Sequence, residues 1–315
     1  MSQVSHMSCP HCDAPRPRAS LAPTCGQCGR PLSVCGGYAV GLEVGRGGVA
    51  KVREAAHPDG TSAVVKVLER TAFNPWQVHQ LFARSARLAS SFDHVGLPRV
   101  LGFERTGDRS FLAMEHLRGG TLSERVVQRR FVTGAAFELL LRNLLEIVAY
   151  LHARSFVHGD VTPRNVMFRA ERDDQPVLID LDGLCSPEEH GLPSLVMTPG
   201  YTAPEQKAGT VTEVSDLYGV GATLIYAATG RSPDQLDRSG ADRELAVSLP
   251  GVSLEARTLV QRLLDLDPRR RPKSARAALR MLDGRNKSGR YGAMLFAAAV
   301  MLLVLFSIAV VTRGG

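Results

Sequence analysis

The chain has 315 residues, of which 44% are hydrophobic and 22% are charged. This composition argues against a disordered protein, and the length suits one large domain with small additions. The net charge of +7 lies almost entirely in one stretch, Arg269 to Arg290, while the rest of the chain is close to neutral. This distribution argues against a nucleic-acid-binding surface and favours a basic segment beside a membrane.

The first 32 residues contain two Cys-x-x-Cys pairs. Cys9 and Cys12 form the first pair, and Cys25 and Cys28 form the second after an interval of twelve residues. Each pair places two thiolates on one tight turn, so both turns together can complete the tetrahedral sulfur shell of a zinc ribbon. Disulfides and idle thiols are the alternatives. We predict a structural Zn²⁺ in residues 1–32, with His11 facing solvent, and a module that binds protein because it carries little charge.

A short linker, residues 33–37, is expected to lead into a domain that covers residues 38–283. Strand-like runs come first, at residues 39–44, 63–68 and 111–114, and longer helical patterns such as residues 137–154 follow. The predicted class is α+β, with a small sheet-rich lobe before a larger helical lobe. Cys35 and Cys185 have no partner pattern, so ordinary packing is expected for both.

Two patterns in the small lobe suit phosphate binding. Gly45, Gly47 and Gly48 lie between two strand-like runs, as in a hairpin whose backbone N–H groups can cover a triphosphate. Lys66 ends a hydrophobic strand fourteen residues after Val52, where its amine can reach phosphate oxygens.

Three polar residues follow in the larger lobe. Asp160 and Asn165 lie five residues apart, and Asp180 follows an apolar strand. They can supply a base that orients a hydroxyl group and two oxygen ligands for Mg²⁺.

The stretch from Val157 to Met167 and the stretch from Val177 to Gly183 resemble motifs of the protein kinase family. The resemblance continues through Thr198 to Glu205, Asp216 to Gly221 and Leu266 to Pro272, in the family's order. It implies a two-lobed kinase fold that binds ATP with Mg²⁺ or Mn²⁺ and phosphorylates protein substrates. The stretch from Thr198 resembles the form found in serine/threonine kinases.

The resemblance also implies a role for single residues. Asp160 would orient the acceptor hydroxyl, Lys66 would hold the α and β phosphates, and Asn165 and Asp180 would bind the metal ion. Glu205 would pair with Arg271, and Asp216 would brace the catalytic loop. The other residues expected around ATP are Val44, Gly45, Gly47, Gly48, Val52, Val64, Met114, Glu115, Leu117 and Met167.

Four positions depart from the family pattern. Ser85 stands nineteen residues after Lys66, where the family has the glutamate that pairs with that lysine, so the ion pair is expected to be missing. Gly159, Thr162 and Asp182 replace other usual residues, and without an arginine at position 159 we expect phosphorylation of the activation loop to change activity little. The alternatives are a pseudokinase scaffold and a phosphotransferase of the aminoglycoside type, which resembles this chain around His158 and Asp180.

Residues 293–311 form an apolar run in which Ser307 is the one polar residue. As a helix it would be roughly 30 Å long, enough to cross a bilayer once. The basic segment 284–292 precedes it, and positive charges favour the cytoplasmic side. We therefore expect a single-pass, tail-anchored protein of the inner or plasma membrane with its kinase domain in the cytoplasm. A buried core helix is the alternative.

Overall fold

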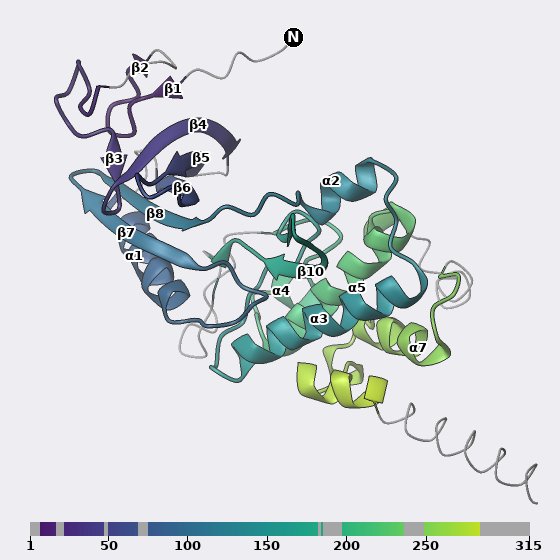
Figure 1. Cartoon of the computed structure of the whole chain (residues 1–315). Coiled ribbons are helices and arrows are strands. Elements are labelled where there is room, and N and C mark those ends of the chain that lie inside the picture. The colour runs from purple at the N-terminus through teal and green to yellow at the C-terminus, as the bar shows by residue number, and fades with distance from the viewer. Residues whose placement is uncertain are drawn as a thin grey trace, which may run out of the picture.

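The computed structural model describes residues 7–16, 22–46, 50–68, 75–181, 184, 197–235 and 249–283. A sheet-rich lobe adjoins a larger helical lobe (Figure 1). The smaller lobe is built on an antiparallel sheet with the strand order β3-β4-β5-β6-β8-β7. Its strands are β3 (Ser33–Val34), β4 (Tyr38–Arg46), β5 (Ala50–Ala56), β6 (Ser62–Leu68), β7 (Val100–Thr106) and β8 (Arg109–Glu115). Helix α1 (Pro75–Ser90) lies between β6 and β7 in the chain and packs against β7 and β8.

The central strands β6 and β8 are apolar on both faces, which indicates that both faces of the sheet are covered. One face, the inner face, packs against α1 through Leu68, Leu112, Phe82 and Ala86. The opposite face, the outer face, carries Val65, Val67, Phe111 and Ala113, which pack against Val34, Cys35 and Tyr38. Residues 33–37, expected to be a linker, therefore contribute a strand and part of a core, because the apolar outer face needs cover.

The helical lobe is held together by apolar side chains of α3 (Gly134–His152) and α5 (Glu213–Thr229). The expected helix at residues 137–154 is α3, whose buried residues recur every three or four positions. The other elements are α2 (Leu122–Val127), the hairpin of β9 (Val166–Arg169) and β10 (Arg172–Leu178), α4 (Pro204–Lys207), η3 (Pro233–Gln235), α7 (Leu254–Leu263), η4 (Pro268–Arg270) and the helical residues 275–283.

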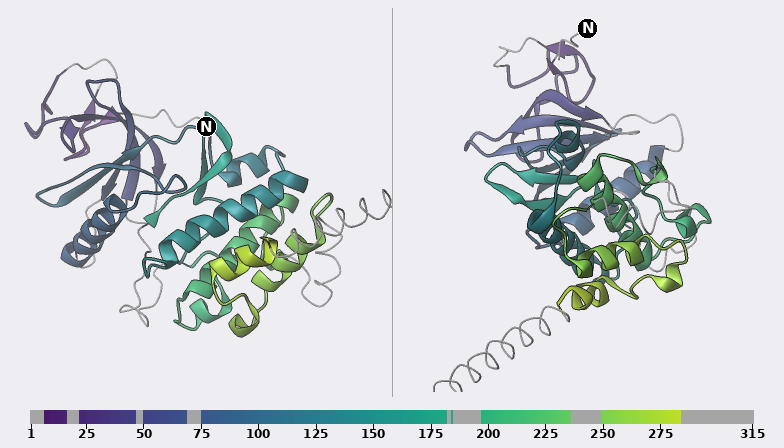
Figure 2. Two further views of the ribbon diagram at one scale, coloured as in Figure 1. Left: turned by 60° about the horizontal axis from the view of Figure 1, so that its bottom comes forward. Right: turned by 90° about the vertical axis from the view of Figure 1, so that its right-hand side faces the viewer.

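The two Cys-x-x-Cys pairs belong to a small module, residues 7–16 and 22–32, which we call the cysteine module. It contains β1 (Met7–Ser8) and β2 (Pro15–Arg16). The module lies on the side of the small lobe that faces away from the helical lobe (Figure 2).

None of the helices in the described part of the chain is long and apolar enough to cross a membrane. The predicted membrane helix 293–311 and the basic segment 284–292 lie outside the described residues.

Candidate active site and metal centre

Asp160 lies in the loop between α3 and β9, and two hydrogen bonds fix the orientation of its carboxylate. One of its oxygens accepts a hydrogen bond from Oγ1 of Thr198 at 2.8 Å, and the other accepts one from Nδ2 of Asn165 at 2.7 Å. Burial raises the pKa of Asp160 above its usual value, although both hydrogen bonds act in the opposite direction. The result is an oriented carboxylate that is a stronger base than an exposed aspartate.

Asp216 supports the loop that carries Asp160, as expected. This buried side chain on α5 accepts hydrogen bonds from the backbone N–H groups of His158 and Gly159, both at 2.8 Å. Helix α5 reaches the loop closely because residue 219 is glycine. A Cβ atom at Gly219 would lie 2.9 Å from the carbonyl oxygen of Val161, closer than a methyl group can approach.

Lys66 pairs with Asp180 across the two lobes. Nζ of Lys66 lies 2.7 Å from Oδ1 of Asp180. Burial tends to raise the pKa of Asp180, but the ammonium group of Lys66 outweighs it and the pKa is lowered. The backbone of Asp180 has φ of 66°, a conformation that is sparsely populated outside glycine and recurs at functional sites.

Helix α1 has no acidic residue, and Ser85 is buried on it. The usual ion pair between α1 and Lys66 is therefore absent, as expected from Ser85. The lysine does not lack a carboxylate partner, however, because Asp180 takes that place. The sequence pattern did not indicate this pairing, which depends on the two lobes meeting.

Several residues expected around ATP lie on the inner face of the sheet. Val52 and Lys66 are directly opposite each other in β5 and β6, and Val64 is opposite Met114 in β8. Directly opposite residues of an antiparallel pair point to the same face, so these four side chains share one side.

The remaining expected nucleotide contacts are partly placed. Leu117 and Met167 line one cavity of about 610 Å³, whose lining does not include Lys66 or Asp180. The backbone N–H of Glu115 already donates to the carbonyl of Arg99 at 2.9 Å, so its carbonyl is the group to consider for a base contact. Val44 and Gly45 lie on β4, and Val44 is exposed. Gly47 and Gly48 lie outside the described residues.

Arg271 and Glu205 form the expected ion pair. Two guanidinium nitrogens of Arg271 donate to the two carboxylate oxygens at 2.6 and 2.9 Å, and the Arg271 side chain is fully buried. The hydroxyl of Ser215 donates to Glu205 as well, at 2.8 Å. This pair ties the segment around α4 to the end of the helical lobe.

The four cysteines predicted to bind zinc come together. All four sulfur atoms lie within 4.8 Å of one another, with Cys9 to Cys28 at 3.8 Å and Cys12 to Cys25 at 3.7 Å. Zinc–sulfur bonds of about 2.3 Å in a tetrahedron place the sulfurs about 3.8 Å apart, which matches the two separations given above.

The surroundings of these sulfurs also suit a metal ion. The backbone N–H groups of Cys28 and Gln27 lower the pKa of Cys25 to about 6, which favours the thiolate that a metal binds. Burial raises the pKa of Cys9 to about 12, and a bound cation would offset that cost. His11 does not face solvent as expected. It is buried, with its ring edge-on to Phe111 at 5.2 Å between centroids.

Two polar residues near the site have contacts that the sequence did not suggest. The buried amide of Gln206 donates to the carbonyl of Gly159 and accepts from the backbone N–H of Ala203, both at 2.9 Å. Its place three residues after the helix cap is the signal that could have found it. The activation loop, Asp180 to Glu205, offers Ser186, Ser194, Thr198 and Thr202 for phosphorylation, and of these Thr202 is buried and donates to the carbonyl of Thr198 at 3.0 Å. Ser186 and Ser194 lie outside the described residues.

A comparison of the whole chain with known protein families agrees with this geometry, which consists of the Asp160 carboxylate, its support by Asp216 and the pair of Lys66 with Asp180. Residues 38–281 match the family model described as a protein kinase domain. The chain belongs to the protein kinase family. This kinase is 29% identical to serine/threonine-protein kinase C of Synechocystis sp. over 265 residues, which cover 78% of the chain and 49% of the relative. It is 28% identical to serine/threonine-protein kinase PknA of Nostoc sp., with coverage of 78% and 47%.

A second Synechocystis relative, serine/threonine-protein kinase B, is 28% identical over 302 residues, which cover 90% of this kinase and 52% of the relative. That share of the chain is larger than residues 38–281, so the similarity continues outside the kinase domain. The kinase spans about half the length of these curated relatives.

Proposed function

We propose that this kinase transfers the γ-phosphoryl group of ATP to serine or threonine hydroxyls of proteins. The observation that carries the proposal is the carboxylate of Asp160, which Thr198 and Asn165 hold in one orientation beside the pair of Lys66 and Asp180. The names of the bacterial relatives support a serine/threonine kinase. Phosphoryl transfer needs mainly positioning and charge stabilisation, which such a fixed arrangement supplies.

The residues present suit a metal ion and a nucleotide. The amide nitrogen of Asn165 donates hydrogen bonds to Asp160, so its carboxamide oxygen is left for a cation. Asp180 has a second carboxylate oxygen besides the one that contacts Lys66. Mg²⁺ or Mn²⁺ would neutralise phosphate charge there. Asp160 would accept the hydrogen bond of the acceptor hydroxyl, and Lys66 would hold phosphate oxygens.

The test is the transfer of labelled phosphate from ATP with Mg²⁺ to the kinase itself and to a basic protein. We expect Asp160→Asn to lower transfer by about a hundredfold or more while nucleotide still binds. Thr210→Val, at an exposed position, is the matched control and should leave transfer unchanged. Transfer to an aminoglycoside in place of protein would support the small-molecule alternative.

A pseudokinase scaffold is a second candidate, because helix α1 has no acidic residue and Lys66 is paired with Asp180. The same assay separates it from an enzyme. A chain that binds ATP but transfers no more phosphate than its Asp160→Asn variant would be a scaffold.

We propose that Cys9, Cys12, Cys25 and Cys28 hold one structural Zn²⁺, supported by the spacing of their sulfurs. Elemental analysis of the full chain should find about one zinc per chain, and Cys9→Ser should lower that content. An intact chain that folds without metal would contradict the proposal. We also propose that the cysteine module binds protein.

We propose that residues 293–311 attach the kinase to a membrane with the kinase domain on the cytoplasmic side, and that the basic segment 284–292 adds attraction to anionic lipid. The apolar sequence of the run supports this. A chain that ends at Asp283 should remain in the supernatant when membranes are sedimented at high salt. Sedimentation of that shorter chain would point to a different anchor.

A further inference from the structure

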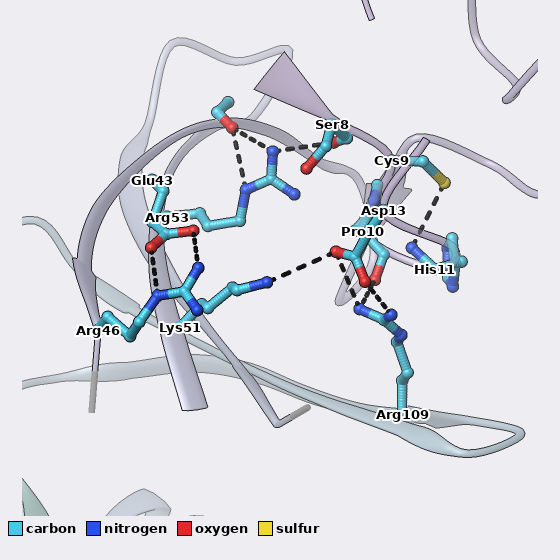
Figure 3. Close-up of polar contacts among 11 residues, drawn as sticks. Ser8, Cys9, Pro10, His11, Asp13, Glu43, Arg46, Lys51, Arg53 and Arg109 are labelled. Carbon is cyan, nitrogen blue, oxygen red and sulfur yellow. Dashed lines mark hydrogen bonds and ion pairs between the residues drawn. The ribbon is translucent and has the colours of Figure 1, made fainter. Parts of the chain in front are cut away.

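The cysteine module contacts two buried arginines on the outer face of the sheet, Arg53 and Arg109 (Figure 3). Arg53 of β5 is 4% exposed. Its guanidinium donates to the carbonyl of Gly41 at 2.7 and 3.1 Å and to the carbonyl of Ser8, in the module, at 2.8 Å. The docking of the module therefore adds a hydrogen bond to a buried cation of the small lobe.

A second buried cation, Arg109 of β8, depends on the module still more. It forms an ion pair with the carboxylate of Asp13 and donates to the carbonyl of Pro10 at 3.2 Å. Lys51 of β5 lies 3.8 Å from the same carboxylate. Buried charges are costly without such partners, so removal of the module would leave Arg109 without these acceptors.

The module's docking groups adjoin the cysteine ligands in the chain. Ser8 precedes Cys9, Pro10 follows it, and Asp13 directly follows Cys12. The turn between them is closed by hydrogen bonds from the N–H of Asp13 to the carbonyl of Cys9 at 3.1 Å, and from the N–H of Cys9 to the carbonyl of Ala14 at 2.8 Å. A metal ion that fixes Cys9 and Cys12 would therefore also fix the groups that meet the arginines.

Strand β5 connects this contact to the nucleotide side of the sheet. Successive side chains of a strand point to opposite faces, so Lys51 and Arg53 point to the module while Val52 points to the inner face. There Val52 is directly opposite Lys66, whose amine contacts Asp180. A displacement of β5 on the module side must therefore move residues on the other face.

We propose that the metal ion in the cysteine module controls nucleotide binding by this kinase, through the contacts of Asp13, Ser8 and Pro10 with Arg109 and Arg53. The inference rests on the proposed zinc site and on the proposed nucleotide-binding function. The partner of the module is then part of the same chain, namely the buried cations Arg53 and Arg109 of the small lobe.

The experiment uses the full chain and measures the binding of a fluorescent ATP analogue with Mg²⁺, the hydrogen exchange of β5 amides, and zinc content. The double variant Cys25→Ser/Cys28→Ser removes two ligands. We expect it to lose zinc, to bind the analogue roughly tenfold more weakly, and to exchange β5 amides faster, while amides of α3 remain protected as a sign of folding.

Arg109→Met tests the contact apart from the metal. It removes the guanidinium and keeps the apolar stem, so we expect it to retain zinc and yet weaken analogue binding severalfold. Arg142→Met is the matched control, because it breaks an exposed ion pair with Asp283 in the helical lobe. It should change neither zinc content nor binding.

The possible failures can be told apart. A folded full chain without zinc overturns both the metal site and the coupling. If the chain holds zinc, but both the cysteine variant and Arg109→Met bind the analogue and exchange β5 amides like the unchanged protein, the coupling alone is overturned. Phosphate transfer is not a readout here, so the absence of transfer would bear on the proposed function and not on this inference.

Discussion

Several neighbouring groups act in opposite directions on the pKa of Asp160. Burial raises its pKa above the usual value, the nearby carboxylate of Asp180 raises it further, and the hydrogen bonds from Thr198 and Asn165 lower it. The proposed function needs this group in its unprotonated form, so activity should fall as the pH falls through this raised pKa. The apparent value belongs to the coupled carboxyls rather than to Asp160 alone.

We predict that Thr198→Val moves the acidic limb of the pH profile of kcat/KM to higher pH. The substitution removes a hydrogen bond that lowers the pKa of Asp160, so the carboxyl should take up its proton at a higher pH. The profile of Thr210→Val, an exposed threonine, should coincide with that of the unchanged kinase. A limb that moves to lower pH would contradict this account.

A second prediction concerns the competition for Asp180. Lys66 uses one oxygen of this proposed metal ligand, and α1 offers the lysine no carboxylate. Ser85→Glu should supply one and thereby release Asp180, so that half-maximal activity needs less Mg²⁺, by roughly fivefold for about 1 kcal/mol of competing ion pairing.

The control for Ser85→Glu is Ser91→Glu, which adds the same charge at an exposed position just beyond α1. It should leave the Mg²⁺ requirement unchanged. An equal effect of both variants would mean that the added charge acts from a distance and not by pairing with Lys66.

The segment around α4 is held in the helical lobe by a buried ion pair. Arg271→Met should lower the free energy of unfolding by about 3 to 5 kcal/mol, because Glu205 is left without its main partner. Arg142→Met breaks an exposed pair and should cost less than about 1 kcal/mol. Urea unfolding of both variants measures the difference, and equal losses would contradict the buried character of the first pair.

The same pair has a defined pH dependence. Burial would raise the pKa of Glu205, but Arg271 outweighs it, so the folded pKa lies below the usual 4.5. The stability from this pair is therefore present above the unfolded pKa and is lost as the pH falls through the folded pKa. The difference in stability between the unchanged kinase and Arg271→Met should shrink in that range.

The elements that the sequence predicts best are those with local signals. The strands at residues 63–68 and 111–114 and helix α3 follow from periodicity, and the catalytic loop follows from a short motif. Contacts between distant segments could not be predicted in this way. Nothing near Arg109 in the chain indicates Asp13, and residues 33–37, which help to cover the apolar outer face of β6 and β8, were expected to be a linker.

His11 and Lys66 show the same limit at single positions. A histidine within a metal-binding turn usually faces water, but this one packs against Phe111, which lies one hundred positions further along the chain. The partner of Lys66 comes from the other lobe. In both cases tertiary packing brings in a neighbour from a distant part of the chain, and local sequence patterns carry no information about such neighbours.

The small lobe depends on residues 1–37 to cover the apolar outer face of its sheet. Deletion of residues 1–37 should expose Val65, Val67, Phe111 and Ala113 to water and leave Arg109 without its carboxylate. We expect the shortened chain to aggregate or to unfold at a markedly lower temperature. Removal of the residues after Asp283 is the matched truncation, and it should leave the unfolding temperature of the kinase domain unchanged.

The ion pair between Asp13 and Arg109 joins residues 96 positions apart. During synthesis the cysteine module leaves the ribosome before β8, and at about 5 to 20 residues per second it waits roughly 5 to 20 s for the strand that carries its arginine partner. In that interval its turns can be held only by their own contacts and by a metal ion. Metal capture by the newly made chain would then come before assembly of the sheet, and metal supply would govern how much kinase matures.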